Sequence, residues 1–178
     1  NPDALQQLLR QVASGALSPA AAGEQLAQLP FKELGHSTLD LHRELRQGVP
    51  ESVYGENKTP EQLIEILSVL SQAHQRALAT RLSPEKAAAV AAALPGTDYN
   101  PTSRLLTLRD PPPPPPTPYA VVACAGTSDL PVAEEAAGTL AFLGHRVERL
   151  TDVGVAGVHR LFDKLDLLRG AAVILSVA

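Results

Sequence analysis

The sequence predicts an α/β protein with two parts, a small helix-rich α/β region over residues 1–109 and a three-layer parallel-sheet domain over residues 119–178. Two observations support this fold class. Before Asp110, hydroxyl–proline pairs mark repeated helix starts. After Tyr119, apolar runs alternate with helical patterns, which is typical of βαβ units with parallel strands.

In the first region, residues 2–14 predict a helix that ends at Gly15 and presents one apolar face, formed by Leu5, Leu8, Leu9 and Val12. Three further helices are expected to begin with a hydroxyl cap followed by proline, at Ser18-Pro19, Thr59-Pro60 and Ser83-Pro84. Gln62 can complete a capping box with Thr59. Short strands are expected at 77–82 and 104–109.

Residues 110–118 read DPPPPPPTP and divide the chain. Consecutive prolines donate no backbone hydrogen bonds and favour an extended polyproline II rod. We therefore predict a semi-rigid linker here. A ligand for a proline-recognition domain is the alternative interpretation.

The second region alternates regularly. We expect strands at 119–125, 145–151 and 171–177 and helices at 131–143 and 157–168, with right-handed crossovers. The last segment, GAAVILSVA, predicts an interior strand, and the chain contains no methionine. We therefore expect further residues on both sides of this chain, so that the sheet domain is incomplete at its C-terminus.

Composition excludes several classes of function. The net charge is −4, with no basic stripe, which gives nucleic-acid binding no support. No apolar run reaches the roughly 18 residues of a membrane span. The single cysteine, Cys124, excludes an internal disulfide and a cysteine-based zinc site, and indicates a reducing compartment such as the cytoplasm. Among alanines and valines, Cys124 is expected to act as a small hydrophobic residue rather than a nucleophile.

Polar residues follow the first two strands of the predicted sheet. Because carboxyl ends of parallel strands meet at one sheet edge, the two groups should converge there. The first group is Gly126, Thr127, Ser128 and Asp129, and the second is Asp152, His159 and Arg160.

These residue types suit a small anionic ligand. Histidine transfers protons near neutral pH, and arginine binds phosphate or carboxylate through two hydrogen bonds. Neither a dinucleotide fingerprint nor a P-loop is present. The alternatives are that Ser128 or Asp129 only caps the turn before Pro131, and that His159 and Arg160 form a solvated basic pair.

A third polar group lies in residues 39–62. Arg43, Arg46 and Lys58 suggest an anion site, and the alternative is a charged helix face on which Glu44 balances its neighbours. A metal site is not predicted, because scattered acids with one histidine give no ligand spacing.

Together these motifs resemble the LarB family, the pyridinium-3,5-biscarboxylic acid mononucleotide synthases. The C-terminal motifs are AGTSDLPVAEEA and DVGVAGVHR, and the N-terminal ones, in order, are LPFKELG, LDLHRELRQGVPE, YGENKTPEQ, ATRLSPE and YNPTSRLLTL. The second region is similar to PurE-type aminoimidazole ribonucleotide carboxylases, whose Ser-Asp and Ala-His-Arg segments correspond to Ser128-Asp129 and to Val158-His159-Arg160.

The resemblance implies carboxylation of nicotinic acid adenine dinucleotide by CO2 or bicarbonate, with release of AMP, to give the precursor of a nickel-pincer nucleotide. Ser128 and Asp129 would hold this nucleotide substrate, His159 would assist proton transfer, and Arg160 would position the loop or a phosphate. No tightly bound cofactor is expected, Mg²⁺ being an optional ion. A homo-oligomer assembled through the PurE-like domain is implied as well.

The sequence departs from the family pattern in three respects. Asn57 replaces a glycine, the proline run is unusual, and the family's nucleophilic cysteine and Gly-Met-Glu-Gly-Ala-Leu-Pro segment are absent from these 178 residues. We therefore expect the 178 residues alone to be inactive. Two other functions stay open, an aminoimidazole ribonucleotide carboxylase or mutase of purine biosynthesis and a non-catalytic nucleotide-binding protein.

Overall fold

The computed structural model describes residues 2–28, 31–41, 43–74, 76–108 and 118–178. The predicted proline linker therefore lies almost entirely outside the described residues. Within the described part of the chain, no helix is long and apolar enough to cross a membrane.

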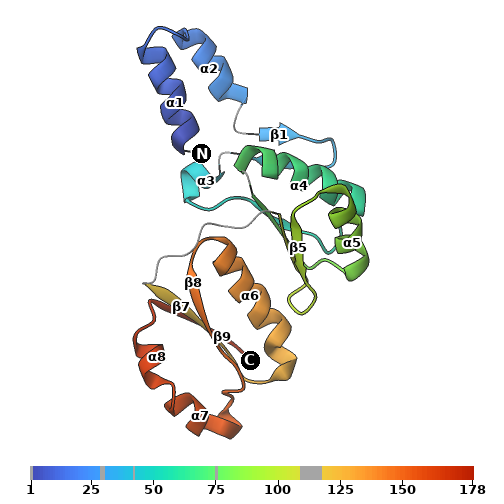
Figure 1. Cartoon of the computed structure of the whole chain (residues 1–178), viewed down its shortest axis with the longest axis vertical. Coiled ribbons are helices and arrows are strands. Elements are labelled where there is room, and N and C mark those ends of the chain that lie inside the picture. Colours follow the sequence, from blue (N-terminus) through green and yellow to red (C-terminus); the bar gives the residue numbers. More distant parts are fainter. Residues whose placement is uncertain (1, 29–30, 42, 75, 109–117) are drawn as a thin grey trace.

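Two helices, α1 (Pro2–Ala13) and α2 (Pro19–Gln28), form a pair at one end of the molecule (Figure 1). The start of α2 is capped as predicted, since the Ala21 N–H donates to Ser18 Oγ. The predicted apolar face of α1 is only partly buried: Leu8 is 8% exposed, but Leu9 is 56% exposed. Because α1 packs mainly against the short α2, one row of its side chains is covered and the neighbouring row stays open.

The next elements are a short antiparallel hairpin and a one-turn helix. Strand β1 (Phe31–Glu33) pairs with β2 (Thr38–Asp40), and α3 (Arg43–Gln47) follows. This strand pair over residues 31–40 was not predicted, because three-residue strands leave too short a pattern to detect.

The four-stranded sheet has the order β3-β4-β6-β5. Strand β3 (Ser52–Tyr54) runs parallel to β4 (Ala77–Thr80), whereas β6 (Leu105–Leu108) is antiparallel to both β4 and β5 (Thr97–Asn100). Helices α4 (Pro60–His74) and α5 (Pro84–Ala93) belong to the same unit, which confirms the helical α/β prediction.

The predicted helix caps of this unit are present. The Thr59 N–H donates to Gln62 Oε1 at 3.0 Å and the Gln62 N–H donates to Thr59 Oγ1 at 3.3 Å, which is the expected capping box. Ser83 accepts a hydrogen bond from the Lys86 N–H. The main core contains, among others, Leu63, Leu67, Leu70, Val90 and Leu106, each 0% exposed.

The C-terminal unit is a parallel sheet with the order β8-β7-β9. Its strands are β7 (Tyr119–Cys124), β8 (Arg146–Leu150) and β9 (Val173–Val177), with α6 (Leu130–Phe142) on one face and α7 (Val158–Phe162) and α8 (Leu165–Arg169) on the other. The predicted three-layer parallel fold is confirmed.

One detail of this unit differs from the prediction. The expected helix 157–168 is divided, because the Lys164 N–H bonds to the Leu161 carbonyl and tightens the last turn of α7. Within the described residues, the expected strand 171–177 is present as β9, which pairs with β7 on one side, and its Val173 is 49% exposed.

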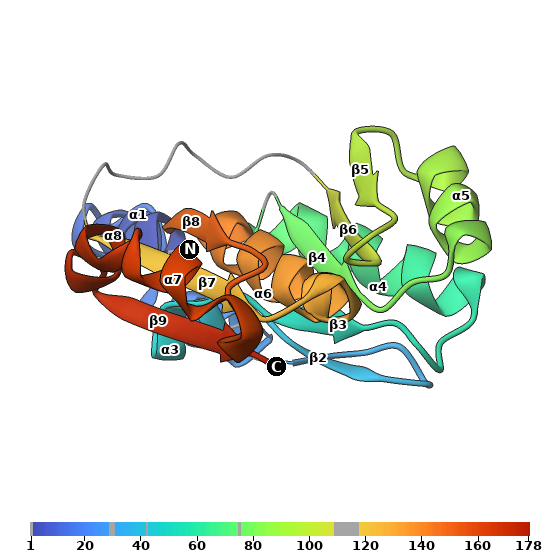
Figure 2. The ribbon, with the colours of Figure 1, turned by 90° about the horizontal axis from the view of Figure 1, so that it is seen from below.

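Helix α6 lies between the two sheets and contacts both (Figure 1 and Figure 2). Its last residue, Phe142, is 2% exposed and clusters with Leu78 and Leu105 from the four-stranded sheet. Arg76 donates from that unit to the Phe142 carbonyl at 3.0 Å, and its guanidinium lies 5.3 Å from the centre of the Phe142 ring. Helix α6 therefore contributes buried side chains to the C-terminal unit and to a cluster with the four-stranded sheet.

Candidate functional site

The two polar corners predicted from the sequence meet at the carboxyl edge of the parallel sheet. The Val153 and Gly154 N–H groups, after β8, donate to the carbonyls of Cys124 and Ala125, at the end of β7, each at 3.2 Å. A Cβ on Gly154 would lie 3.1 Å from the Ala125 oxygen, so a side chain there would push the corners apart. The backbone itself thus fixes the two loops together.

In the first corner, Asp129 closes the loop. Its Oδ2 accepts the Gly126 N–H at 2.8 Å, and its Oδ1 accepts the Ser128 hydroxyl at 3.4 Å. Among the described residues, neither Asp129 nor another side chain caps the first turn of α6. Thr127 and Ser128 are exposed. The corner therefore exposes two hydroxyls beside a helix N-terminus, whose dipole favours an anion.

In the second corner, Arg160 folds back onto Asp152. Its Nη1 donates to the Asp152 carbonyl at 3.0 Å and to the Asp152 carboxylate. Asp152 has a φ of 61°, and a Cβ on Gly157 would lie 2.8 Å from the Arg160 Nε. Arg160 therefore orders this loop. His159 is exposed at the start of α7, and its ring makes no hydrogen bond within the described part of the chain.

Of the other three predicted anion-binding residues, Arg43 and Lys58 are not brought together. Arg43 begins α3, and the following Glu44 pairs with Arg76, at the amino end of β4. Lys58 follows the carboxyl end of β3, which runs parallel to β4. The side chain of Arg46 lies outside the described residues. Arg43 and Lys58 therefore lie near opposite ends of this strand pair.

Two side chains that the sequence interpretation did not single out lie next to α6. Arg81, directly after β4, donates through Nε to Glu135 Oε2 at 2.9 Å, and Tyr54 lies beside it at the end of β3. Arg81 has a φ of 61°. The sequence did not predict this arrangement, because no local sequence pattern indicates an arginine with a left-handed backbone conformation.

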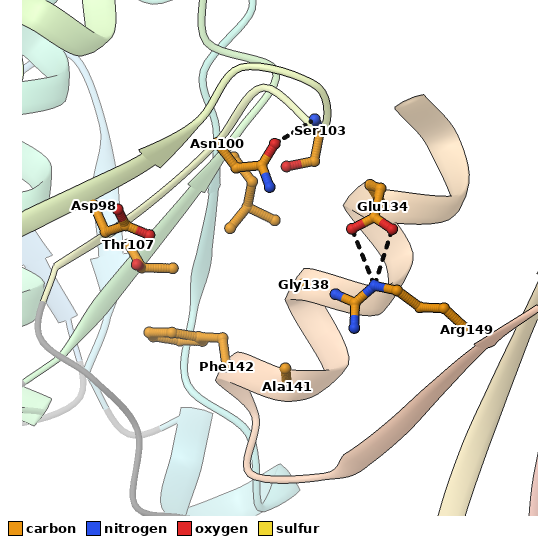
Figure 3. A pocket seen from close by; sticks show the side chains of 10 residues that line it. Asp98, Asn100, Ser103, Thr107, Glu134, Gly138, Ala141, Phe142 and Arg149 are labelled. Atoms are coloured by element: carbon orange, nitrogen blue, oxygen red, sulfur yellow. Dashed lines mark hydrogen bonds and ion pairs between the residues drawn. The ribbon is translucent and has the colours of Figure 1, made fainter. Parts of the chain in front are cut away.

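A pocket of about 190 Å³ opens between the β5–β6 hairpin and α6, as Figure 3 shows. Its apolar floor includes Leu105 and Phe142, and Arg149 on its rim donates through Nε to both carboxylate oxygens of Glu134, at 2.9 and 3.1 Å. These two charges offset each other, and Asp98 adds a further acidic group to the lining, so the pocket does not favour an anion. Over the described residues there is no group of three or more His, Cys, Asp or Glu side chains that could hold a metal ion.

Cys124 is 1% exposed within β7 and packs under α6. Burial raises the pKa of its thiol, and the nearby Asp129 and Glu134 carboxylates raise it further. A protonated, covered thiol is a poor nucleophile. The structure thus agrees with the interpretation of Cys124 as a packing residue.

We expect the folded 178-residue chain to react slowly with a thiol reagent at pH 7.5 and rapidly in denaturant, because only unfolding exposes Cys124, its single cysteine, and returns the pKa of the thiol to the ordinary value. Absorbance of the released chromophore measures both rates. Equal rates in the two conditions would contradict the burial of this thiol.

Comparison with known proteins gives the family. Residues 31–110 match the LarB/PurE-like N-terminal domain. An uncharacterized protein of Methanocaldococcus jannaschii is 33% identical over 168 residues, which cover 90% of this chain. The chain spans 66% of the length of that relative. Residues 31–110 therefore belong to the LarB/PurE-like N-terminal domain family.

Proposed function

We propose that the full-length protein is a carboxylase–hydrolase that converts nicotinic acid adenine dinucleotide and CO2 or bicarbonate into pyridinium-3,5-biscarboxylic acid mononucleotide and AMP. Membership of the LarB/PurE-like family indicates a carboxylase-like or PurE-related enzyme. The observation that carries the finer proposal is the pair of corners held together by the Val153 and Gly154 hydrogen bonds.

In this proposal the first corner binds the anionic part of the substrate. The N-terminus of α6 is uncapped by side chains and offers a positive dipole end, while its Leu130 N–H donates to the Thr127 carbonyl and Pro131 has no N–H. Ser128 and Thr127 add exposed hydroxyls, and Asp129 keeps the loop closed through the Gly126 N–H. Arg160 keeps the facing loop in place through Asp152.

His159 is proposed as the proton acceptor. Carboxylation of a pyridinium ring requires a nucleophile that adds to the ring, a new bond from a ring carbon to CO2, and loss of the proton from that carbon. An exposed imidazole at the sheet edge can take this proton at neutral pH. Expulsion of the nucleophile then restores the aromatic ring.

Cys124 is not proposed as the nucleophile. It is the single cysteine of the 178 residues and is buried in β7. We therefore propose that these 178 residues alone bind the nucleotide without completing carboxylation. A tightly bound cofactor is not part of the proposal, and CO2 or bicarbonate serves as co-substrate.

We also propose that the C-terminal unit assembles into a homo-oligomer. Large apolar side chains are exposed on α7 and on β9, with Phe162 at 59%, Val173 at 49% and Ile174 at 48% exposure. Such side chains on neighbouring elements are more frequent at subunit contacts than on the surface of a monomer.

The test is incubation of the full-length protein with ¹³C-bicarbonate, nicotinic acid adenine dinucleotide and aminoimidazole ribonucleotide together, with products followed by mass spectrometry. We expect ¹³C in a dicarboxylated pyridinium mononucleotide and release of AMP. Label in the imidazole would instead assign the protein to purine biosynthesis. A folded protein that labels neither substrate would refute the carboxylase proposal and leave nucleotide binding without catalysis.

A further inference from the structure

The carboxyl ends of β3 and β4 form a tightly held edge beside α6. The Gly55 N–H donates to the Thr80 carbonyl at 2.9 Å. A Cβ on Gly55 would lie 2.5 Å from Leu82 Cδ1 and 3.0 Å from the Thr80 oxygen, so only glycine permits this approach. The residues that flank this contact, Tyr54 and Arg81, are consequently brought side by side.

The side chains of Arg104 and Lys86 hold this edge in place through hydrogen bonds to its backbone carbonyls. Arg104 donates to the carbonyls of Arg81 at 3.0 Å and Leu82 at 3.2 Å. Lys86 donates to the carbonyls of Gly55 at 3.2 Å and Glu56 at 2.6 Å. Arg81 and Arg104 both have left-handed backbone angles, with φ of 61° and 55°. Such strain in non-glycine residues concentrates at ligand sites, where surrounding contacts hold it.

The edge presents an aromatic ring and a guanidinium to solvent. Tyr54 is 50% exposed, and the Arg81 guanidinium carbon lies 6.0 Å from its ring centre. The Tyr54 hydroxyl donates to the Glu56 carboxylate, which raises the pKa of the phenol and lowers that of the carboxyl. Tyr54 therefore stays neutral at physiological pH, while Arg81 carries a positive charge that its ion pair with Glu135 partly offsets.

A hollow of about 300 Å³ lies next to Tyr54, which forms part of its lining. Its wall includes the apolar and almost fully buried Leu39, Val53 and Ile66, and Lys58 also lines it. Ser37 lines the same hollow, and its hydroxyl is buried without a hydrogen-bond partner in the described part of the chain. A buried polar atom left unsatisfied suggests a missing ligand group or water.

This edge also lies close to the proposed active site. Arg81 contacts Glu135, which stands six residues after Asp129 along α6. Six residues of helix correspond to about 9 Å along its axis. The edge and the first corner are therefore close enough to contact different parts of one extended ligand.

We propose that Tyr54 and Arg81 form a nucleotide-binding platform, on which an aromatic ring of the substrate stacks against Tyr54 while Arg81 binds a phosphate. This inference rests on the proposed function, because it assigns a second contact to the same dinucleotide. The ring lies over Tyr54 toward the 300 Å³ hollow, whose wall includes Lys58 and Glu51. The N-terminal unit thus contributes directly to substrate binding.

The test measures the affinity of the full-length protein for nicotinic acid adenine dinucleotide and for AMP by calorimetry, in four variants. Tyr54→Leu and Arg81→Gln are expected to weaken binding of the dinucleotide roughly tenfold or more, because stacking and phosphate contacts are lost. Tyr54→Phe keeps the ring and is expected to stay within about threefold of the parent protein.

Arg76→Gln is the matched control. Arg76 also reaches α6 from the N-terminal unit, through the Phe142 carbonyl, but it lies at the amino end of β4. It should leave affinity unchanged. If Arg76→Gln weakens binding as much as Arg81→Gln, Arg81 only docks the two units and the platform is refuted. Unchanged affinity in Tyr54→Leu, or no nucleotide binding by the folded parent protein, refutes it as well.

The same variants separate this inference from the proposed reaction. Nucleotide binding that depends on Tyr54 and Arg81, without ¹³C incorporation into the pyridinium ring, would support the platform and refute the reaction. Incorporation of ¹³C at an unchanged rate and affinity in Tyr54→Leu would support the reaction and refute the platform.

Discussion

Replacing His159 with alanine is expected to lower carboxylation by the full-length protein about 10²- to 10⁴-fold, the range typical of a lost general base. The ring is exposed at the carboxyl edge of the parallel sheet and makes no hydrogen bond among the described residues. The substitution should therefore leave the thermal unfolding midpoint within about 1 °C, since surface changes of this kind are nearly neutral. Initial rates of ¹³C incorporation measure the first effect, and calorimetry measures the second.

His145→Ala is the matched control for this variant. His145 is also exposed, but it precedes β8 and lies at the opposite, amino edge of the sheet. Its loss should leave the rate unchanged. Full activity in a folded His159→Ala protein would contradict the proposed role, and an equal loss in both variants would show that a general change in charge is responsible.

Replacing Phe142 with alanine is expected to lower the free energy of unfolding by about 3–5 kcal/mol, the cost of removing a buried aromatic side chain. Phe142 is 2% exposed between α6 and the four-stranded sheet, and the Arg76 guanidinium lies over its ring. The packing that this substitution removes lies between α6 of the C-terminal unit and the four-stranded sheet of the N-terminal unit. We therefore also expect the single unfolding transition in urea to separate into two.

Leu9→Ala provides the comparison for Phe142→Ala. Leu9 is 56% exposed on α1, so its removal should change the free energy of unfolding by less than about 0.5 kcal/mol. Urea titrations followed by circular dichroism give both values. A destabilisation of less than about 1 kcal/mol in Phe142→Ala would mean that α6 is not held between the two sheets.

The local features of the fold were predictable from the sequence, because they depend on neighbouring residues. Hydroxyl caps before proline located the starts of three helices, and the Thr59–Gln62 box is present as expected. Apolar runs that alternate with helical patterns predicted the parallel strands of the second unit. The connectivity rule for parallel sheets then placed Gly126–Asp129 and residues 151–160 at one edge, where backbone hydrogen bonds join them.

Other features depended on contacts between distant residues. No local pattern indicates that α6 packs on two sheets, since the contacts of Phe142 and Glu135 join residues more than 50 positions apart. The left-handed Arg81 exists because Arg104, from a later strand connection, binds its carbonyl.

The sequence by itself therefore determined the fold class, the family resemblance and the two converging corners. The tertiary structure decided that Arg43 and Lys58 lie near opposite ends of a strand pair, and that Tyr54 and Arg81 meet beside α6. The physical reason is the range of the interactions. Caps, periodicity and strand order act over a few residues or follow general rules, whereas side-chain neighbours across two units are set by the packing of the complete chain.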